Sequence, residues 1–141
     1  MKSLTTNLLI AAAALAAAAG SAAAQTYTAE MPMAFRVGKT VMEPGSYEFK
    51  VLARQTGAVI VSVHNRESDA TVSLIPFNGS DAPKAWREKA APIISLKCAA
   101  RTCTLDRMWN ASDNFTYQFR AEKLPEGERV ALLTVTMTRT D

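Results

Sequence analysis

The stretch that decides the fold reads ISLKCAARTCTLD and covers residues 94–106. Apolar and polar residues alternate on both sides of a short loop, with Cys98 before the loop and Cys103 after it. Pairing of the two cysteines across this loop places Leu96 opposite Leu105, so the disulfide and the apolar face require the same strand register. The stretch therefore predicts a β-hairpin closed by a disulfide between Cys98 and Cys103.

Strand-like alternation also dominates the sequence on both sides of this hairpin. Apolar residues recur at every second position in 33–37, 47–51, 115–119 and 131–137, and residues 58–75 form two such segments around the polar turn 65–69. Turn residues such as Pro44, Gly45, Pro125 and Gly127 separate the segments. We therefore expect an all-β fold, namely an antiparallel β-sandwich or a small barrel of about seven to nine short strands.

Residues 78–92 break this alternation. Asp81 has a side chain that can cap a helix N-terminus, and Pro83 follows near the position where a helix tolerates proline. We expect at most one short helix near residues 82–90, with Asp81 as its N-cap.

The N-terminus has the features of a secretory signal peptide. The basic residue Lys2 precedes an apolar run from Leu8 to Ala19, and small residues follow up to Ala24. This run is shorter than the roughly 20 residues that span a bilayer. We expect residues 1–24 to be cleaved before Gln25 and residues 25–141 to form a single β domain. A retained membrane anchor or an Ala-rich amphipathic helix is the alternative for the N-terminal segment.

Charge and cysteine content limit the expected partners. The formal net charge is +3, and the two signs are interspersed after residue 25, whereas nucleic-acid binding requires a clustered basic face. We expect a periplasmic or extracellular protein with no nucleic-acid partner, no cofactor and no stable membrane insertion after cleavage. An oxidising compartment favours the disulfide. A metal site is disfavoured, because zinc needs four ligands and His64 is the single histidine.

Trp86 is the first candidate for ligand contact, because it lies in an irregular, charged segment where periodicity does not assign it to the core. An exposed Trp with Asn78 and Arg87 nearby can stack on a sugar or anchor a partner protein. Trp86, Arg87 and Asn78 are therefore the candidate ligand-binding residues. For Trp86 itself the favoured interpretation is that it closes one end of the sandwich.

His64 would have to serve in any Ser/His/Asp or Cys/His mechanism. No Gly-x-Ser-x-Gly run accompanies it, and both thiols are expected to be oxidised. We therefore interpret His64 as a hydrogen-bonded or exposed strand residue. The closely spaced carboxylates lie in predicted turns, where they are usually solvated: Glu67 with Asp69, and Glu126 with Glu128. No catalytic residue is assigned from the sequence.

Two segments resemble a family of small exported bacterial proteins. In residues 31–48 the shared features are a Phe-x-Val-Gly strand that starts at Phe35, the Pro44-Gly45 turn, and Tyr47 at the opening of the next strand. Residues 96–105, continued to Trp109, are similar to a later hairpin of that family. The family has no assigned activity, so the resemblance implies an exported, β-rich domain and assigns no functional residue.

These features favour a non-enzymatic binding or structural domain of the bacterial envelope, which contacts an unknown ligand or envelope protein. One alternative is a small periplasmic hydrolase with a site built from loop carboxylates or His64. Another is an adhesin or fibre subunit that associates through an unpaired edge strand.

Export predicts a defined N-terminus. Mass spectrometry of protein recovered from the periplasm is expected to find Gln25, or its cyclised form, as the first residue. Recovery of a soluble protein that still begins at Met1 would contradict the signal-peptide interpretation.

Overall fold

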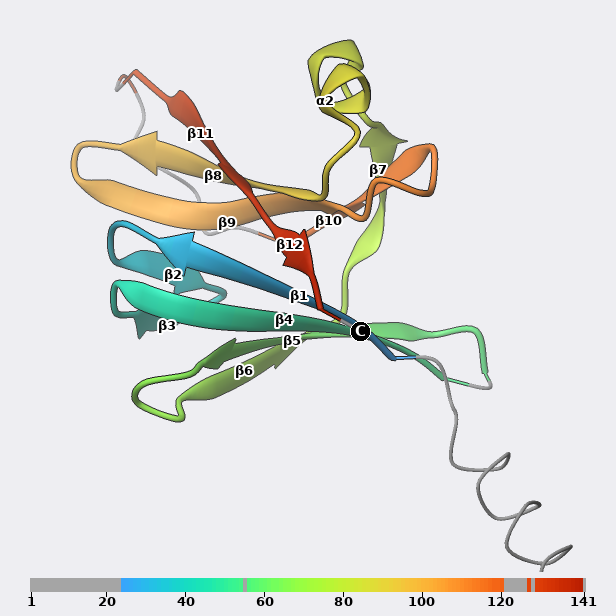
Figure 1. The fold of residues 1–141 in the computed structure, drawn as a ribbon. Helices are drawn as coiled ribbons and strands as arrows, with labels where there is room; N and C mark the ends of the chain where they lie inside the picture. Colours follow the sequence, from blue (N-terminus) through green and yellow to red (C-terminus); the bar gives the residue numbers. More distant parts are fainter. Residues whose placement is uncertain (1–23, 55, 121–126, 128, 141) are drawn as a thin grey trace, which may run out of the picture.

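The computed structural model describes residues 24–54, 56–120, 127 and 129–140. The predicted signal peptide therefore lies outside the described residues, apart from Ala24. Among the described residues the chain forms two sheets and one short helix, in agreement with the all-β prediction. Figure 1 shows the two sheets as stacked layers.

Sheet A has five strands in the order β12-β1-β4-β5-β6. Strands β1, β4, β5 and β6 are antiparallel neighbours; short turns join β4 to β5 and β5 to β6, whereas the chain between β1 and β4 passes through β2 and β3 in the other sheet. Their bounds are β1 (Ala24–Met31), β4 (Gly45–Ala53), β5 (Val59–Asn65), β6 (Thr71–Leu74) and β12 (Thr138–Arg139).

Sheet B has seven strands, with the order β11-β8-β9-β10-β7 and the small β2–β3 hairpin beside β9. Arg36 in β2 pairs in parallel with Thr104 in β9. Both strand orders are open over the described residues, so the domain is a sandwich and not the small barrel that the sequence also allowed. The strand bounds are β2 (Phe35–Val37), β3 (Thr40–Met42), β7 (Phe77–Asp81), β8 (Ile93–Ala99), β9 (Thr102–Trp109), β10 (Phe115–Gln118) and β11 (Ala131–Thr136).

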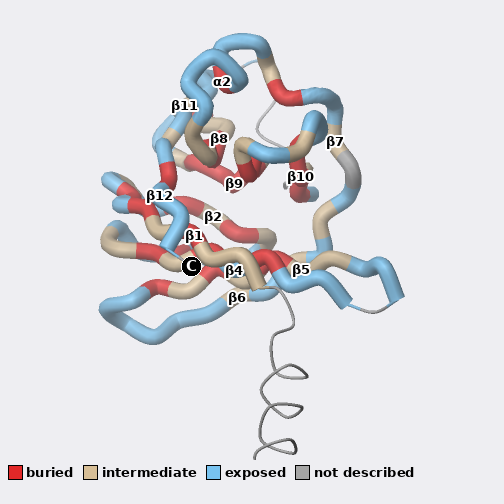
Figure 2. The backbone as a smooth tube through the Cα atoms, turned by 45° about the vertical axis from the view of Figure 1, so that its right-hand side comes forward, coloured by how far each residue is buried: buried red, intermediate tan, exposed pale blue. Residues whose placement is uncertain are grey.

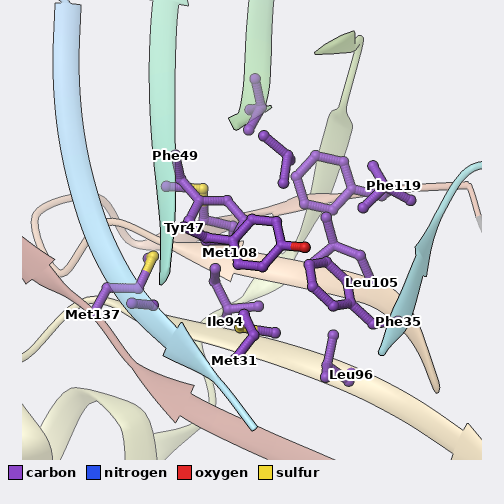
Figure 3. Close-up of a cluster of buried hydrophobic side chains, with 14 of the residues drawn as sticks. Met31, Phe35, Tyr47, Phe49, Ile94, Leu96, Leu105, Met108, Phe119 and Met137 are labelled. Carbon is purple, nitrogen blue, oxygen red and sulfur yellow. The ribbon is translucent and has the colours of Figure 1, made fainter. Parts of the chain in front are cut away.

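The space between the sheets is filled by the apolar side chains that alternation assigned to one face of each strand. In β4 these are Tyr47, Phe49 and Val51, and in β8 Ile94 and Leu96. Figure 3 shows this cluster, and Figure 2 shows that the buried backbone concentrates on the facing strands. Full burial of each large side chain stabilises the fold by roughly 1.5–3 kcal/mol.

The predicted hairpin forms β8 and β9 with the expected register, in which Cys98 faces Cys103 and Leu96 faces Leu105. The two sulfur atoms lie at disulfide distance, and the Cα atoms are 4.0 Å apart. The Cys103 sulfur also contacts the Met33 sulfur at 3.2 Å. Closer to Trp109 a β-bulge shifts the pairing, so that Ser95 faces Arg107 and Asp106 has no opposite residue.

Three expectations about element boundaries are wrong. The helix α2 (Lys84–Lys89) begins after Pro83, which is its N-cap, and has no side-chain cap. Asp81 is instead the last residue of β7, because its backbone pairs with Phe115 and the chain stays extended up to the proline.

The segment 131–137 was expected to be one strand, but it divides between the sheets. Residues of β11 pair with β8 in sheet B, and after Met137 the chain enters sheet A as β12. Met137 is buried at the crossing and donates its backbone N–H to the carbonyl of Pro92. Similarly, Pro32 ends β1 before the expected strand 33–37, of which only Phe35–Val37 forms β2.

Tyr47 connects two turns of sheet A through its hydroxyl group. The hydroxyl donates to the carbonyl of Glu43 and accepts a hydrogen bond of 3.0 Å from the side-chain amide of Asn65. The side-chain carbonyl oxygen of Asn65 accepts hydrogen bonds from the backbone N–H groups of Glu67 and Ser68 and so closes the β5–β6 turn. The turn before β4 and the turn after β5 are therefore held by one buried phenol.

The first stability prediction concerns this phenol. Tyr47→Phe keeps the ring but leaves the buried Asn65 amide without its acceptor, so we expect a loss of about 1–3 kcal/mol in the free energy of unfolding. Tyr27→Phe is the control, because the Tyr27 hydroxyl bonds the Gln25 side chain near the start of β1. An equal loss in both variants, measured by urea unfolding, would contradict the role assigned to Tyr47.

The same phenol predicts an alkaline effect. Burial raises the pKa of Tyr47 above its ordinary value of 10.0. As the pH rises past 10, the unfolded chain loses this proton before the folded chain does, so stability declines with pH in that range. In Tyr47→Phe this decline is expected to be smaller, and unfolding curves at pH 8 to 11 would measure it.

The disulfide predicts a modest stabilisation, because it closes a very short loop. The chain-entropy relation gives on the order of 2 kcal/mol for such a loop. Protein isolated from the periplasm is expected to have no free thiol, and the Cys98→Ser, Cys103→Ser double variant is expected to fold and melt several degrees lower. Two reactive thiols per chain would exclude the bond, and failure of the variant to fold would show a larger role.

Candidate functional site

The outer side of sheet A carries a row of polar side chains from four neighbouring strands. Thr28 faces Glu48, Glu48 faces His64, and His64 faces Thr71. The residues before and after Thr28 and Glu48 are buried between the sheets, so alternation directs this row outwards. A second row beside it contains Lys50 and Ser62, which face each other. We call these six outward side chains the polar face: Thr28, Glu48, Lys50, Ser62, His64 and Thr71.

Both ring nitrogens of His64 lie near oxygen atoms. Nδ1 lies 2.7 Å from the Thr71 hydroxyl oxygen, and Nε2 lies 3.5 Å from a carboxylate oxygen of Asp69. Thr71 comes from β6 and Asp69 from the turn before it, so the hairpin itself orients the imidazole. Glu48 forms an ion pair of 3.1 Å with Lys50 on its own strand.

The polar face is hollowed. A depression of about 370 Å³ is lined by Glu48, Lys50, Ser62, His64, Arg66 and Thr71. A second depression of about 310 Å³ extends the surface towards β12, and Arg66 and Thr28 contribute to its lining. Because Arg66 lines both, the two hollows adjoin. The lining of the larger hollow offers hydrogen-bond donors and acceptors of both charges and contains no Phe, Tyr or Trp.

The outer side of sheet B is occupied by a different cluster. Asp106 follows the inward Leu105 and so points to this side, where it is only 3% exposed. Its carboxylate lies 3.5 Å from the Lys97 ammonium, 3.4 Å from the Arg107 guanidinium and 3.4 Å from the Ser95 hydroxyl. Two cations and a hydroxyl thus satisfy the buried charge, as a structural ion cluster requires.

This cluster also holds the helix on the sheet. The Arg107 guanidinium lies 5.0 Å from the ring centroid of Trp86, a cation–π contact. Trp86 is 7% exposed and packs with Ala82, Ile93 and Trp109. Figures 1 and 2 show α2 on the outer side of β8 and β9.

The three residues expected to bind a ligand do not share one exposed surface. Trp86 lies on the buried side of α2, so its ring is not open for stacking on a sugar. Arg87, the next residue of the helix, is exposed. Asn78 lies in β7, where its backbone pairs with Tyr117. Trp86 therefore has a packing role, but it covers the outer side of sheet B and not one end of the sandwich.

The other candidates fall in different places. His64 is half-buried and hydrogen-bonded, in agreement with its interpretation as a strand residue. Glu67 and Asp69 are exposed in the β5–β6 turn. Glu126 and Glu128 lie outside the described residues. The sequence interpretation missed the polar face as a unit, although the outward positions of β4 and β5 already alternated with the apolar ones.

Two searches of the described residues are negative. No group of three or more His, Cys, Asp or Glu side chains in the described part of the chain is arranged to hold a metal ion. Within the same residues, no helix has the length and apolar character that crossing a membrane requires.

Comparisons with known proteins assign no family. The sequence matches no protein-family model and no curated protein, and no solved structure matches the chain.

Proposed function

We propose that the chain is an exported, non-enzymatic binding module of the bacterial envelope, whose ligand lies on the polar face of sheet A. The observation that carries this proposal is the hollow around His64, where six side chains from three neighbouring strands and the turn after β5 converge. A sheet paired over its full length holds these groups at fixed spacing, which lowers the entropic cost of binding.

The chemistry of the hollow favours an uncharged, hydroxyl-rich ligand such as an envelope glycan. Glu48 accepts hydrogen bonds, Lys50 and Arg66 donate them, and Ser62 and Thr71 do both. Because the Glu48 carboxylate lies beside the Lys50 ammonium and Arg66 lines the same hollow, a strongly charged ligand would meet a like charge there. A sugar hydroxyl group can donate to the carboxylate and accept from the cations at once.

Export rests on the sequence. A signal-peptide pattern in residues 1–24, the cysteine pair and the resemblance to small exported proteins support an oxidising location. Ala24 is the first residue of β1 and pairs with Leu52, so the proposed cleavage after Ala24 would remove one residue from the start of this strand.

A second candidate function has one specific observation in its favour. Asp69, His64 and Thr71 follow one another as carboxylate, imidazole and hydroxyl, as in a hydrolase triad, but Nδ1 faces the hydroxyl and Nε2 the carboxylate, the reverse of the serine-protease arrangement. The Asp69 side chain is 91% exposed, so water screens its charge and weakens its hold on the imidazole. We therefore favour binding over hydrolysis for this hairpin.

Titration of the ¹⁵N-labelled mature protein with chitotetraose tests the proposal. NMR shift changes are expected in β4, β5 and β6, and Glu48→Gln is expected to weaken binding roughly tenfold, as for loss of a hydrogen bond to a charged group. Glu88→Gln is the matched control, because Glu88 lies on α2 and far from this sheet in the fold.

Other outcomes would contradict specific parts of the proposal. NMR shift changes in sheet B instead of sheet A would show that the ligand binds elsewhere than on the polar face. A response to inorganic phosphate, without one to the saccharide, would show an anionic ligand. Hydrolysis of an activated ester by the wild type, and its loss in Thr71→Val, would favour the hydrolase function over the binding function.

A further inference from the structure

Among the residues that the structure describes, strand β11 is the least protected sheet edge. Edge strands expose unpaired backbone groups, and proteins usually shield them by short length, charge or proline. Over the described residues, β12 has two residues, β3 three and β6 four, whereas β11 has six. β6 is followed by Ile75-Pro76, and β7, with five residues, by Ala82-Pro83.

The segment that contains β11 has none of these protections. Residues 130–138 include no charged residue and no proline. Val130 is 50% exposed and Leu132 is 58% exposed, which places apolar area beside the open backbone edge. Among the described residues, β8 is the one strand that pairs with β11.

The edge is also held rigidly. β11 pairs with β8 over its whole length, from Ala131 opposite Cys98 to Thr136 opposite Ile93. β8 is joined to β9 by the pairing that ends at Cys98 and Cys103. A strand fixed in this way loses little conformational freedom when another strand adds to it.

We infer that β11 pairs with the β11 of a second copy of this chain, antiparallel and about a two-fold axis. In such a pair every residue meets the same segment, so like charges would face each other unless the segment is uncharged, as 130–138 is. The segment meets this charge condition, so a second copy fits this edge as its occupant.

The side-chain pattern limits the register. Leu133 and Val135 point to the core side, and Leu132 and Thr134 point outwards. Paired residues must lie on the same side of a sheet. Placing Leu133 opposite its own copy meets this condition, with Ala131 opposite Val135 and Leu132 opposite Thr134. The two copies of sheet B then form one continuous sheet.

A charge at the centre of the edge tests the inference. In this register Thr134→Lys places each lysine opposite Leu132 of the second copy and makes the two lysines diagonal neighbours across the axis. Dimerisation is therefore expected to weaken at least tenfold. Ser73→Lys is the matched control, because Ser73 is exposed at the middle of β6, another edge strand. Sedimentation equilibrium of the mature protein over a range of concentrations measures both.

A small interface of this kind predicts a concentration-dependent dimer rather than a permanent one. Wild-type amides of β11 are expected to become more protected from hydrogen exchange as concentration rises, while those of β6 do not change; this measurement needs no variant. A monomer at every concentration would overturn the inference. So would a dimer that resists Thr134→Lys, equal weakening by Ser73→Lys, or a ladder of larger oligomers.

Discussion

The pairing of β8 with β9 is the constraint on which sheet B depends. β8 supports β11 on one side, and β9 supports both β10 and β2 on the other. Both faces of this hairpin are covered, because Leu96 and Leu105 pack between the sheets while Ile93 and Trp109 lie under α2. A shift of one residue would exchange these two sets, so the register is strongly specified.

The bulge at Asp106 decides which side chains of β9 face the inner core and which face α2. Without the extra residue, strict alternation would turn Met108 away from the inner core and bring Trp109 into it. The bulge therefore sends Met108 inwards and Trp109 outwards, and keeps Arg107 on the same side as Asp106, which Arg107 and Lys97 neutralise. The position of Trp86 and of the whole helix follows from this one irregularity through its contact with Arg107.

Sheet A depends in a similar way on a single buried group. The Tyr47 hydroxyl and the Asn65 amide hold the turns at the ends of β4 and β5, and these strands display Glu48 and His64. The polar face therefore rests on a rigid frame, with its imidazole oriented by the next turn. The polar face and the β11 edge belong to different sheets, so ligand binding and self-association need not compete for the same strand.

The sequence by itself determined the class of fold, the hairpins 58–75 and 94–106, and the pairing of Cys98 with Cys103, because alternation and turn residues act over a few neighbours. It did not determine which sheet each strand joins. The run 131–137 alternates evenly, and only packing makes it cross from one sheet to the other at Met137. Likewise the charged local segment left open whether Trp86 is exposed, and Ile93, Trp109 and Arg107, distant in sequence, bury it. The polar face was hidden for the same reason: Glu48, His64 and Thr71 become neighbours only through cross-strand register, which long-range pairing decides.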